Sequence, residues 1–286
     1  MKYAVRHATV YTYEDPVDLA SHMLHLTPRR IPGQAVMSAS VTAVPAPSRV
    51  TEAADHFGNV VSWMFLDLPH ERFEVTLRAE VEVEFAHPPD AAVTPAWEAV
   101  AARARGDYRC AEFVFDSPMA PADAGAGAYA AASFPPRRPV LVGLLDLNAR
   151  IRREFTFKSG VTTLATPVAK VLALRAGVCQ DFTHLMIAGL RALGLPARYV
   201  SGYLRTWPSP GQGSRQGADQ SHAWVGAWLG PDHGWVDLDP TNDLVVRDEH
   251  VVLAWGRDYG DISPVRGVIL GGGAHRVSVG VDLRAV

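Results

Sequence analysis

The sequence predicts an α+β protein, with an antiparallel β-sandwich domain over residues 1–90 and a domain of helices packed on an antiparallel sheet over residues 91–286. Three observations lead to this fold class. Residues 73–85 are apolar at every odd position and polar at every even position, which is typical of a strand with one buried and one solvated face. The chain becomes alanine-rich and compatible with helices from about residue 95. Strand-like segments return after residue 197, so the second part mixes helices and strands.

Three further segments complete the predicted sandwich. Residues 3–13, 35–44 and 60–66 have the composition of β-strands. The residues DHFGN at 55–59 supply a turn between two of these strands. The residues HPPD at 87–90 then interrupt the pattern as a linker does, so we place the domain boundary there.

The helices of the second part are recognised by their ends. A small-residue loop is expected near 122–127. Thr166, followed by a proline, has the pattern of an N-cap and a first helical residue. This helix should stop at Gly177, and a second helix should run from Cys179 until Gly194 ends it.

Strands follow the second helix. Residues 198–204, 221–229 and 235–239 are expected to be strands. The last two should form a hairpin, because GPDHG at 230–234 is rich in turn-forming residues. The segment 208–217 contains several glycine, proline and serine residues, and we expect it to be a mobile loop.

Composition excludes several classes of protein. Two cysteines among 286 residues cannot form a disulfide framework. A net charge of −3 gives no excess of positive charge for nucleic acid or anionic lipid, so neither is expected as a partner. No apolar run reaches the length of a signal peptide or the ~18 residues of a membrane span. We therefore expect a cytoplasmic protein, in which cysteines stay reduced.

The two cysteines have different settings. Cys179 stands where a helix is predicted to begin, and a helix N-terminus offers unpaired N–H groups and partial positive charge that stabilise a thiolate. That position favours a nucleophile, although a buried cysteine is often only a small apolar residue. Cys110 has no comparable setting, so we expect it to be inert packing.

A cysteine nucleophile needs a base, and the predicted hairpin supplies one. Along the strand 221–229, alternation leaves His222 and Trp224 on the face opposite to the small apolar residues. If the aliphatic faces of the two strands coincide, only every second register is allowed. One register sets His222 directly opposite Asp239, and the next sets Trp224 opposite Asp239 with His222 on the diagonal. Asp239 is therefore the better orienting group for His222 than Asp237.

Four motifs in this order resemble the bacterial transglutaminase-like superfamily, of the two-domain type with an N-terminal β domain. They are GVCQDFTHLM at 177–186, ALGLPARYVSGY at 192–203, SHAW at 221–224 and GWVDLDPTN at 234–242. The resemblance covers the segment from about 140 to 270 and includes GRDYGD at 256–261. It implies a papain-like core in which Cys179 is the nucleophile, His222 the base and Asp239 the orienting acid.

The resemblance also implies an activity. We expect acyl transfer from a peptide or protein amide through a thioester on Cys179, as in a cysteine peptidase or amidase. Transfer to an amine, the transglutaminase reaction, is the first alternative, and a non-catalytic binding scaffold is the second. The backbone N–H of Cys179 could stabilise the oxyanion, and Trp224 and Trp235 could line the substrate groove.

Some features of the family are not found. Val178 and Gln180 flank the cysteine, whereas animal cross-linking enzymes have glutamine and tryptophan there, and neither a side-chain oxyanion donor nor a calcium loop can be recognised. No cofactor or metal is expected. In particular, Cys179 and His184 are five residues apart on a helix and point in different directions, which disfavours zinc.

Overall fold

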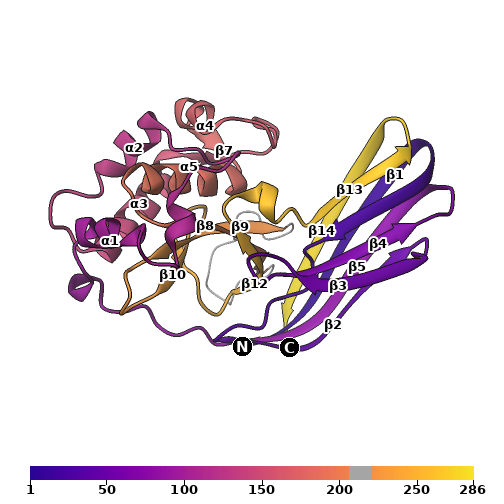
Figure 1. The fold of residues 1–286 in the computed structure, drawn as a ribbon, viewed down its shortest axis with the longest axis horizontal. Helices are drawn as coiled ribbons and strands as arrows, with labels where there is room; N and C mark the ends of the chain where they lie inside the picture. Colours follow the sequence, from indigo (N-terminus) through magenta and orange to yellow (C-terminus); the bar gives the residue numbers. More distant parts are fainter. Residues whose placement is uncertain (206–220) are drawn as a thin grey trace.

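The computed structural model describes residues 1–205 and 221–286, and the expected loop at 208–217 lies outside the described residues. The chain forms two parts, which are separate in the ribbon view of Figure 1: a long, seven-stranded sheet and a part that combines helices with a five-stranded sheet. The expected α+β class is confirmed. Both chain termini lie at the same end of the long sheet (Figure 1).

The long sheet is antiparallel throughout and contains strands from both ends of the chain. Its strand order is β2-β5-β1-β4-β3, and β13 and β14 also pair with β1. The strands are β1 (Lys2–Leu24), β2 (Gln34–Val44), β3 (Arg49–Ala54), β4 (Val60–Leu66), β5 (His70–Val83), β13 (Val265–Gly271) and β14 (His275–Ala285). The N-terminal region was expected to be a sandwich of two sheets, whereas all of its strands join one hydrogen-bonded sheet.

Strand β1 explains this difference. It is 23 residues long, and each half pairs with different neighbours. Its first half, from Lys2 to Tyr13, pairs with β5 and β14, and its second half, from Val17 to Leu24, pairs with β13 and β4. The alternation expected for β5 is present, because Phe73 and every later odd-numbered residue of the strand are buried.

The last two strands cross the expected division of the chain. That division at about residue 90 stays a prediction, but residues 265–285, expected in the second domain, pair with β1. The pairing of Tyr3 with Ala285 brings the two ends of the chain together. The backbone hydrogen bonds of an antiparallel ladder therefore connect the first and last strands.

The second part is built around helix α5 (Cys179–Ala192), which is largely buried. Helices α2 (Ala124–Ala131) and α4 (Val168–Leu174) pack against one side of α5, and strands β8 and β9 pack against it as well. Glycine is required where α2 crosses α5, because a Cβ on Gly189 would lie 2.9 Å from the backbone oxygen of Ala126. The apolar face of α5 thus forms the centre of the core.

The five-stranded sheet has the order β11-β10-β9-β8-β12 and is antiparallel. Its strands are β8 (Ala197–Leu204), β9 (His222–Trp228), β10 (Trp235–Asp239), β11 (Leu244–Val245) and β12 (His250–Gly256). The remaining elements are helices α1 (Trp97–Ala104) and α3 (Val140–Glu154), the short 3-10 helices η1 (Ala91–Val93), η2 (Ala111–Val114) and η3 (Tyr259–Asp261), and the parallel pair β6 (Thr156–Phe157) and β7 (Ala176–Gly177). The three strands expected over 198–239 are present with nearly the expected bounds.

Two helix predictions need correction. The expected loop near 122–127 is instead the start of α2, whose N-cap Asp123 accepts a hydrogen bond from the Ala126 backbone N–H at 2.8 Å. Helix α4 begins at Val168 and ends at Leu174, earlier than expected, because Arg175 adopts the left-handed conformation with φ of 51°. Thr166 does not cap α4 but accepts a hydrogen bond from the Thr163 backbone N–H.

Side-chain amides join the two parts of the molecule at β12. This strand is an edge of the five-stranded sheet, and unpaired edge groups need partners. Gln34 donates to the carbonyl of Val252 at 2.8 Å and accepts from its N–H at 2.7 Å. Asn59 makes the equivalent pair of bonds with Trp255, both at 2.9 Å. The N-terminal sheet therefore fixes the position of β12.

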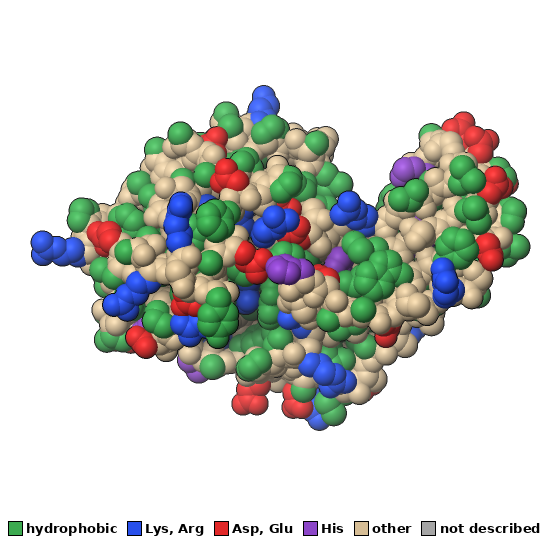
Figure 2. Space-filling view, in the orientation of Figure 1, with side chains coloured by type: hydrophobic (Ala, Val, Ile, Leu, Met, Phe, Trp, Pro, Cys, Tyr) green, Lys and Arg blue, Asp and Glu red, His purple; other side chains and the backbone are tan. Residues whose placement is uncertain are grey.

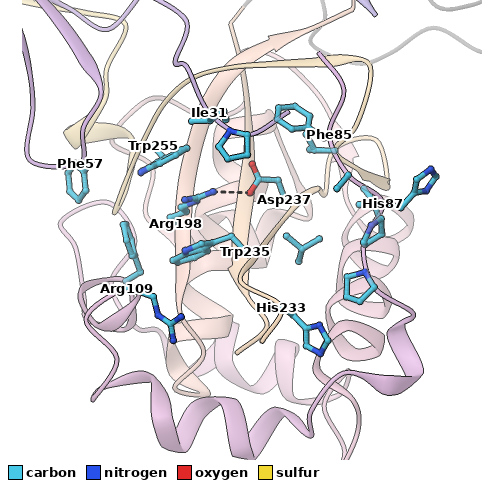
Figure 3. A pocket seen from close by; sticks show the side chains of 18 of the residues that line it. Ile31, Phe57, Phe85, His87, Arg109, Arg198, His233, Trp235, Asp237 and Trp255 are labelled. Carbon is cyan, nitrogen blue, oxygen red and sulfur yellow. Dashed lines mark hydrogen bonds and ion pairs between the residues drawn. The ribbon is translucent and has the colours of Figure 1, made fainter. Parts of the chain in front are cut away.

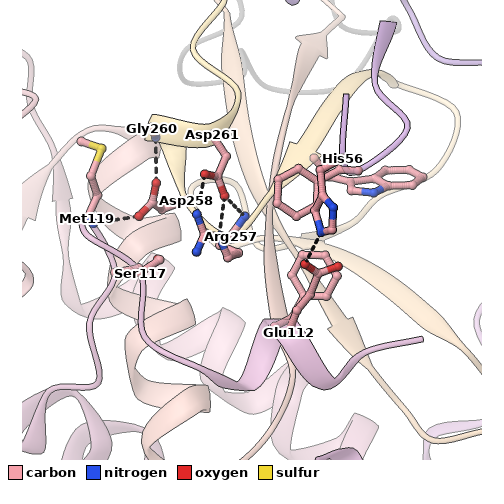
Figure 4. Close-up of polar contacts among 12 residues, drawn as sticks. His56, Glu112, Ser117, Met119, Arg257, Asp258, Gly260 and Asp261 are labelled. Carbon is pink, nitrogen blue, oxygen red and sulfur yellow. Dashed lines mark hydrogen bonds and ion pairs between the residues drawn. The ribbon is translucent and has the colours of Figure 1, made fainter. Parts of the chain in front are cut away.

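The segment after β12 is fixed by acidic side chains (Figure 4). Asp258 accepts hydrogen bonds from the backbone N–H groups of Met119 and Gly260, at 2.7 and 2.8 Å. Arg257 forms a two-pronged ion pair with Asp261, with both N–O distances at 2.9 Å. These contacts tie the GRDYGD segment to the chain before α2.

The surface matches the balanced composition. On the face drawn in Figure 2, basic and acidic side chains are interspersed over the helix-containing part, and acidic side chains lie at the tip of the long sheet. Within residues 1–205 and 221–286, no helix is both long and apolar enough to cross a membrane.

Candidate active site

Cys179 is the first residue of α5, and the residues before it explain why the helix begins there. The carboxylate of Asp181, in the first turn of α5, accepts a hydrogen bond from the Val178 backbone N–H at 2.7 Å and another from the Thr162 hydroxyl at 2.7 Å. Gly177 is needed because a Cβ there would lie 2.6 Å from the same carboxylate. Cys179 is therefore held, partly exposed, at the positive end of a 14-residue helix.

His222 begins strand β9 and contacts Asp239 at the end of β10. Their side chains are 0% exposed, and His222 Nε2 lies 2.9 Å from Asp239 Oδ2. Asp237 pairs with Gly226 and Leu238 with Val225, so His222 lies diagonally from Asp239. This is the second of the two registers that the sequence allows.

The electrostatics of His222 favour the imidazolium form. Burial lowers the pKa of His222, but the negative charges of the Asp239 carboxylate and of a Cys179 thiolate raise it more, to about 10. Nδ1, the ring nitrogen that does not face Asp239, is buried and has no hydrogen-bond partner among the described residues. It is therefore the nitrogen available to the Cys179 thiol.

Asp239 is fixed from several directions. Its Oδ1 accepts from the backbone N–H groups of Thr241 and Asn242 at 2.9 and 3.3 Å, and its Oδ2 accepts from the Asn242 side-chain amide at 2.9 Å. Burial alone raises the pKa of Asp239, but the neighbouring imidazoles hold it well below its usual range. The carboxylate is therefore ionised and immobile.

A second imidazole, that of His250, was not predicted. His250 begins β12, is 1% exposed, and places Nε2 at 3.3 Å from the same Oδ2 of Asp239. The strand character of HVVLAW at 250–255 is readable in the sequence, but its distance from Asp239 is set by β8 and β9, which separate β12 from β10 in the sheet. The site is therefore a buried His–Asp–His cluster beside a cysteine.

This cluster is also the one place in the described residues where three metal-ligating side chains converge, with their ligand atoms within 4.8 Å of one another. The hydrogen bonds of both imidazoles to Asp239 account for the arrangement. The Nε2 of His184, the histidine considered from the sequence as a zinc partner of Cys179, accepts a hydrogen bond from the Tyr259 backbone N–H at 3.2 Å.

Asp237 and the two tryptophans have other roles. Asp237 accepts from Trp224 Nε1 at 3.0 Å and pairs with Arg198 at 3.3 Å, so it does not orient His222. Trp224 is 0% exposed and packs in the core, and does not line an open groove as expected. Trp235 does line a cavity, but Cys179 is not among the residues of its wall.

Cys110 lies in the core, as its sequence setting predicts. It is 0% exposed, and its Sγ lies 3.6 Å from the Ala104 carbonyl oxygen. Burial raises the pKa of the Cys110 thiol to about 12, so this cysteine is protonated and unreactive at neutral pH. Both cysteines are free thiols.

Comparison with known proteins identifies two family models in the chain. The model of the bacterial transglutaminase-like N-terminal region matches residues 3–82, and that of the transglutaminase-like superfamily matches residues 139–240. An uncharacterized protein of Mycobacterium tuberculosis is 40% identical over 292 residues, which cover 99% of this chain and 92% of that protein.

Two further comparisons concern a solved structure and a shorter sequence match. A crystal structure of a candidate cysteine protease from Cytophaga hutchinsonii has the same fold, with a TM-score of 0.75 at 22% identity over 99% of this chain and 90% of that one. A protein-glutamine gamma-glutamyltransferase of Pseudomonas aeruginosa is 40% identical over 68 residues, or 23% of this chain and 10% of that protein.

Proposed function

Because this chain belongs to the transglutaminase-like superfamily, we propose that it is a thiol-dependent enzyme that cleaves amide bonds through a thioester on Cys179. The observation that carries the proposal is the 2.9 Å contact between His222 and Asp239, two buried side chains beside a cysteine at a helix N-terminus. A nucleophile, a base and a group that orients the base form the set required for covalent acyl transfer.

The residues act in sequence. His222, as an imidazolium, holds the proton that has left the Cys179 thiol, and the thiolate attacks the carbonyl carbon of the amide. The C–N bond then breaks, and His222 returns the proton to the leaving nitrogen, so that a thioester and a free amine result. Asp239 keeps the imidazole in one orientation and stabilises its charge. The Cys179 backbone N–H, in the first turn of α5, would stabilise the oxyanion, and such a donor contributes about 2.7 to 4 kcal/mol.

Water is the proposed acceptor of the acyl group, which makes the protein a cysteine peptidase or amidase for peptide or protein substrates. Transfer to a primary amine is the second candidate. It is favoured by the 68-residue likeness to a protein-glutamine gamma-glutamyltransferase. The two reactions share every step up to the thioester and differ in what attacks it.

Partitioning of the thioester distinguishes the two reactions. A fluorogenic peptide amide is incubated with the protein, with and without excess primary amine, and the acyl products are identified by mass spectrometry. Mainly free acid in the presence of amine supports the peptidase, and mainly amine adduct contradicts it. Cys179→Ala should abolish both products, whereas Cys110→Ala is the matched control and should keep them. If neither product forms and Cys179 is alkylated no faster than a simple thiol, the chain is a binding scaffold.

The cytoplasm is the proposed compartment. Two cysteines that remain free thiols support it, because a reducing compartment keeps a catalytic thiol available. Cell fractionation with an antibody to the chain would test this, and recovery with an extracytoplasmic fraction would contradict it.

A further inference from the structure

A cavity of about 660 Å³ lies between the two parts of the molecule and contains none of the three residues of the proposed active site in its wall. This volume is within the range of small-molecule pockets, roughly 300 to 1,000 Å³. Figure 3 shows Ile31 and Phe85 at the top of the cavity, Phe57 at its left, and Trp255 and Trp235 above and below Arg198. Most of the wall is apolar or aromatic.

Two arginines lie in this wall: Arg109 is exposed and pairs with Asp107 at 2.6 Å, whereas Arg198 is buried. The guanidinium of Arg198, from β8, lies between the rings of Trp235 and Trp255, at 4.5 and 4.0 Å from their centroids (Figure 3). Arg198 is only 9% exposed. Stacking between two indoles fixes the plane of the guanidinium and removes the need for a flexible side chain to order on binding.

Arg198 is incompletely paired. A guanidinium has five N–H donors, whereas among the described residues Arg198 has a single side-chain acceptor, Asp237, at 3.3 Å. That carboxylate also accepts from Trp224. The Arg198 Nε is buried without any hydrogen-bond partner in the described chain. A buried charge in this condition favours an additional anionic acceptor.

A second guanidinium strengthens the positive field. Arg29 lies 3.6 Å from the centroid of Trp255, so two arginines share one indole. Its hydrogen-bond acceptors are the neutral oxygens of Phe57 and Asn59, and its Nε also has no partner among the described residues. Burial and the charge of Arg198 both lower the pKa of Arg29, to about 10. Two neighbouring guanidiniums thus share the Trp255 indole, while the Asp237 carboxylate pairs with Arg198 and the Asp55 carboxylate acts on Arg29.

We infer that this cavity is a second binding site, which takes a carboxylate joined to an aromatic or branched apolar body. The carboxylate binds the guanidinium of Arg198, and the apolar body fills the space between the tryptophans and the phenylalanines. Either a free organic acid or the C-terminus of a peptide has this chemistry.

The buried side chain of Trp224 lies between the cavity and the proposed active site. Trp224, which is fully buried, donates to Asp237 on the cavity side, and its ring lies 6.2 Å from that of His222 on the other. Occupation of the cavity therefore needs no reaction at Cys179, and binding can be measured with the Cys179→Ala variant, in which no probe is consumed. Failure of this inference and failure of the proposed function are then independent.

Calorimetric titration of the Cys179→Ala protein provides the test. The probes are 3-phenylpropionate and N-acetylphenylalanine, which stand for the free acid and the peptide C-terminus, and the corresponding amide of each. At least one acid should bind, at least about tenfold more tightly than its amide, because a hydrogen bond to a charged group is worth about that factor or more. The acid that binds more tightly shows whether the ligand is a free organic acid or the C-terminus of a peptide.

Variants locate the site. Arg198→Gln should weaken binding of the acid by roughly 10- to 100-fold, whereas Arg49→Gln, on the exposed strand β3, removes the same charge elsewhere and should not. Because Arg198→Gln leaves Asp237 without a cation and could misfold, Val245→Trp is the second variant: it fills the cavity without changing charge. Equal binding of acid and amide, no binding of any probe, or full binding by folded Val245→Trp protein would overturn the inference.

Discussion

The substitution Asp239→Asn probes the electrostatic basis of the site most sharply. In the native protein, Asp239 and Cys179 raise the pKa of His222 from 6.5 to about 10 against the effect of burial. Since one pH unit corresponds to about 1.4 kcal/mol, the net stabilisation of the imidazolium, after the opposing effect of burial, is on the order of 5 kcal/mol. Asparagine keeps the shape of the side chain but removes its charge, so burial then dominates and the pKa of His222 falls.

The pH dependence of kcat/KM measures this change. His222 must be protonated to return a proton to the leaving nitrogen, so native activity should persist until the pH rises through about 10. In Asp239→Asn, the alkaline limb should move to lower pH by at least about two units, and activity at pH 9 should fall at least about tenfold. The matched control is Asp237→Asn, because Asp237 lies two residues away on β10 and bonds Trp224 and Arg198 instead. An alkaline limb that stays in place in folded Asp239→Asn protein would refute the reasoning.

Three further predictions concern positioning and stability. His250→Phe removes one imidazole from the buried Asp239 carboxylate. It should cost roughly 1.5 to 3 kcal/mol, either in the free energy of unfolding or in the transition-state stabilisation measured by kcat/KM, and His250→Gln should restore part of this loss. A pH profile and a stability that both stay unchanged would contradict this prediction. Gln34→Ala removes two hydrogen bonds to β12 and should lower the free energy of unfolding in urea by about 1 to 3 kcal/mol, whereas Gln180→Ala, in the half-buried first turn of α5, is a control for loss of an amide. Burial lowers the pKa of His7, His22 and His184 to about 4. As the pH falls below 6.5, the unfolded chain therefore binds protons before the folded protein does, and the free energy of unfolding should decrease by about 1.4 kcal/mol per pH unit for each histidine down to pH 4. A urea midpoint that stays constant over this pH range would refute this prediction.

The three proposed catalytic residues could be predicted from local patterns. Gly177 and Cys179 mark the start of α5 in the sequence. The alternation of side chains along a strand places His222 on one face of β9. The aliphatic faces of β9 and β10 then leave two registers, both of which bring Asp239 near His222. The structure selects one of the two, a choice that depends on how the hairpin turns at 230–234.

What could not be predicted depends on contacts between distant segments. His250 reaches Asp239 because β12 pairs with β8, across the sheet from β10, and nothing in the local pattern of β12 indicates that partner. The pairing of β14 with β1 joins residues separated by almost the whole chain, so the two-sheet expectation for the N-terminal region failed. Glycines at 125 and 127 indicated a loop, but they are required by close packing of α2 on α4 and α5.

The central claim is that Cys179 forms a thioester, and trapping the acyl-enzyme tests it most directly. The protein is mixed with an activated peptide ester, quenched in acid within the first turnover, digested and examined by mass spectrometry. We expect the acyl group on the peptide that contains Cys179, at close to one group per chain, and none on Cys110, which is buried and protonated. Acylation at another residue, or amide cleavage by the Cys179→Ala variant at the native rate, would contradict the claim.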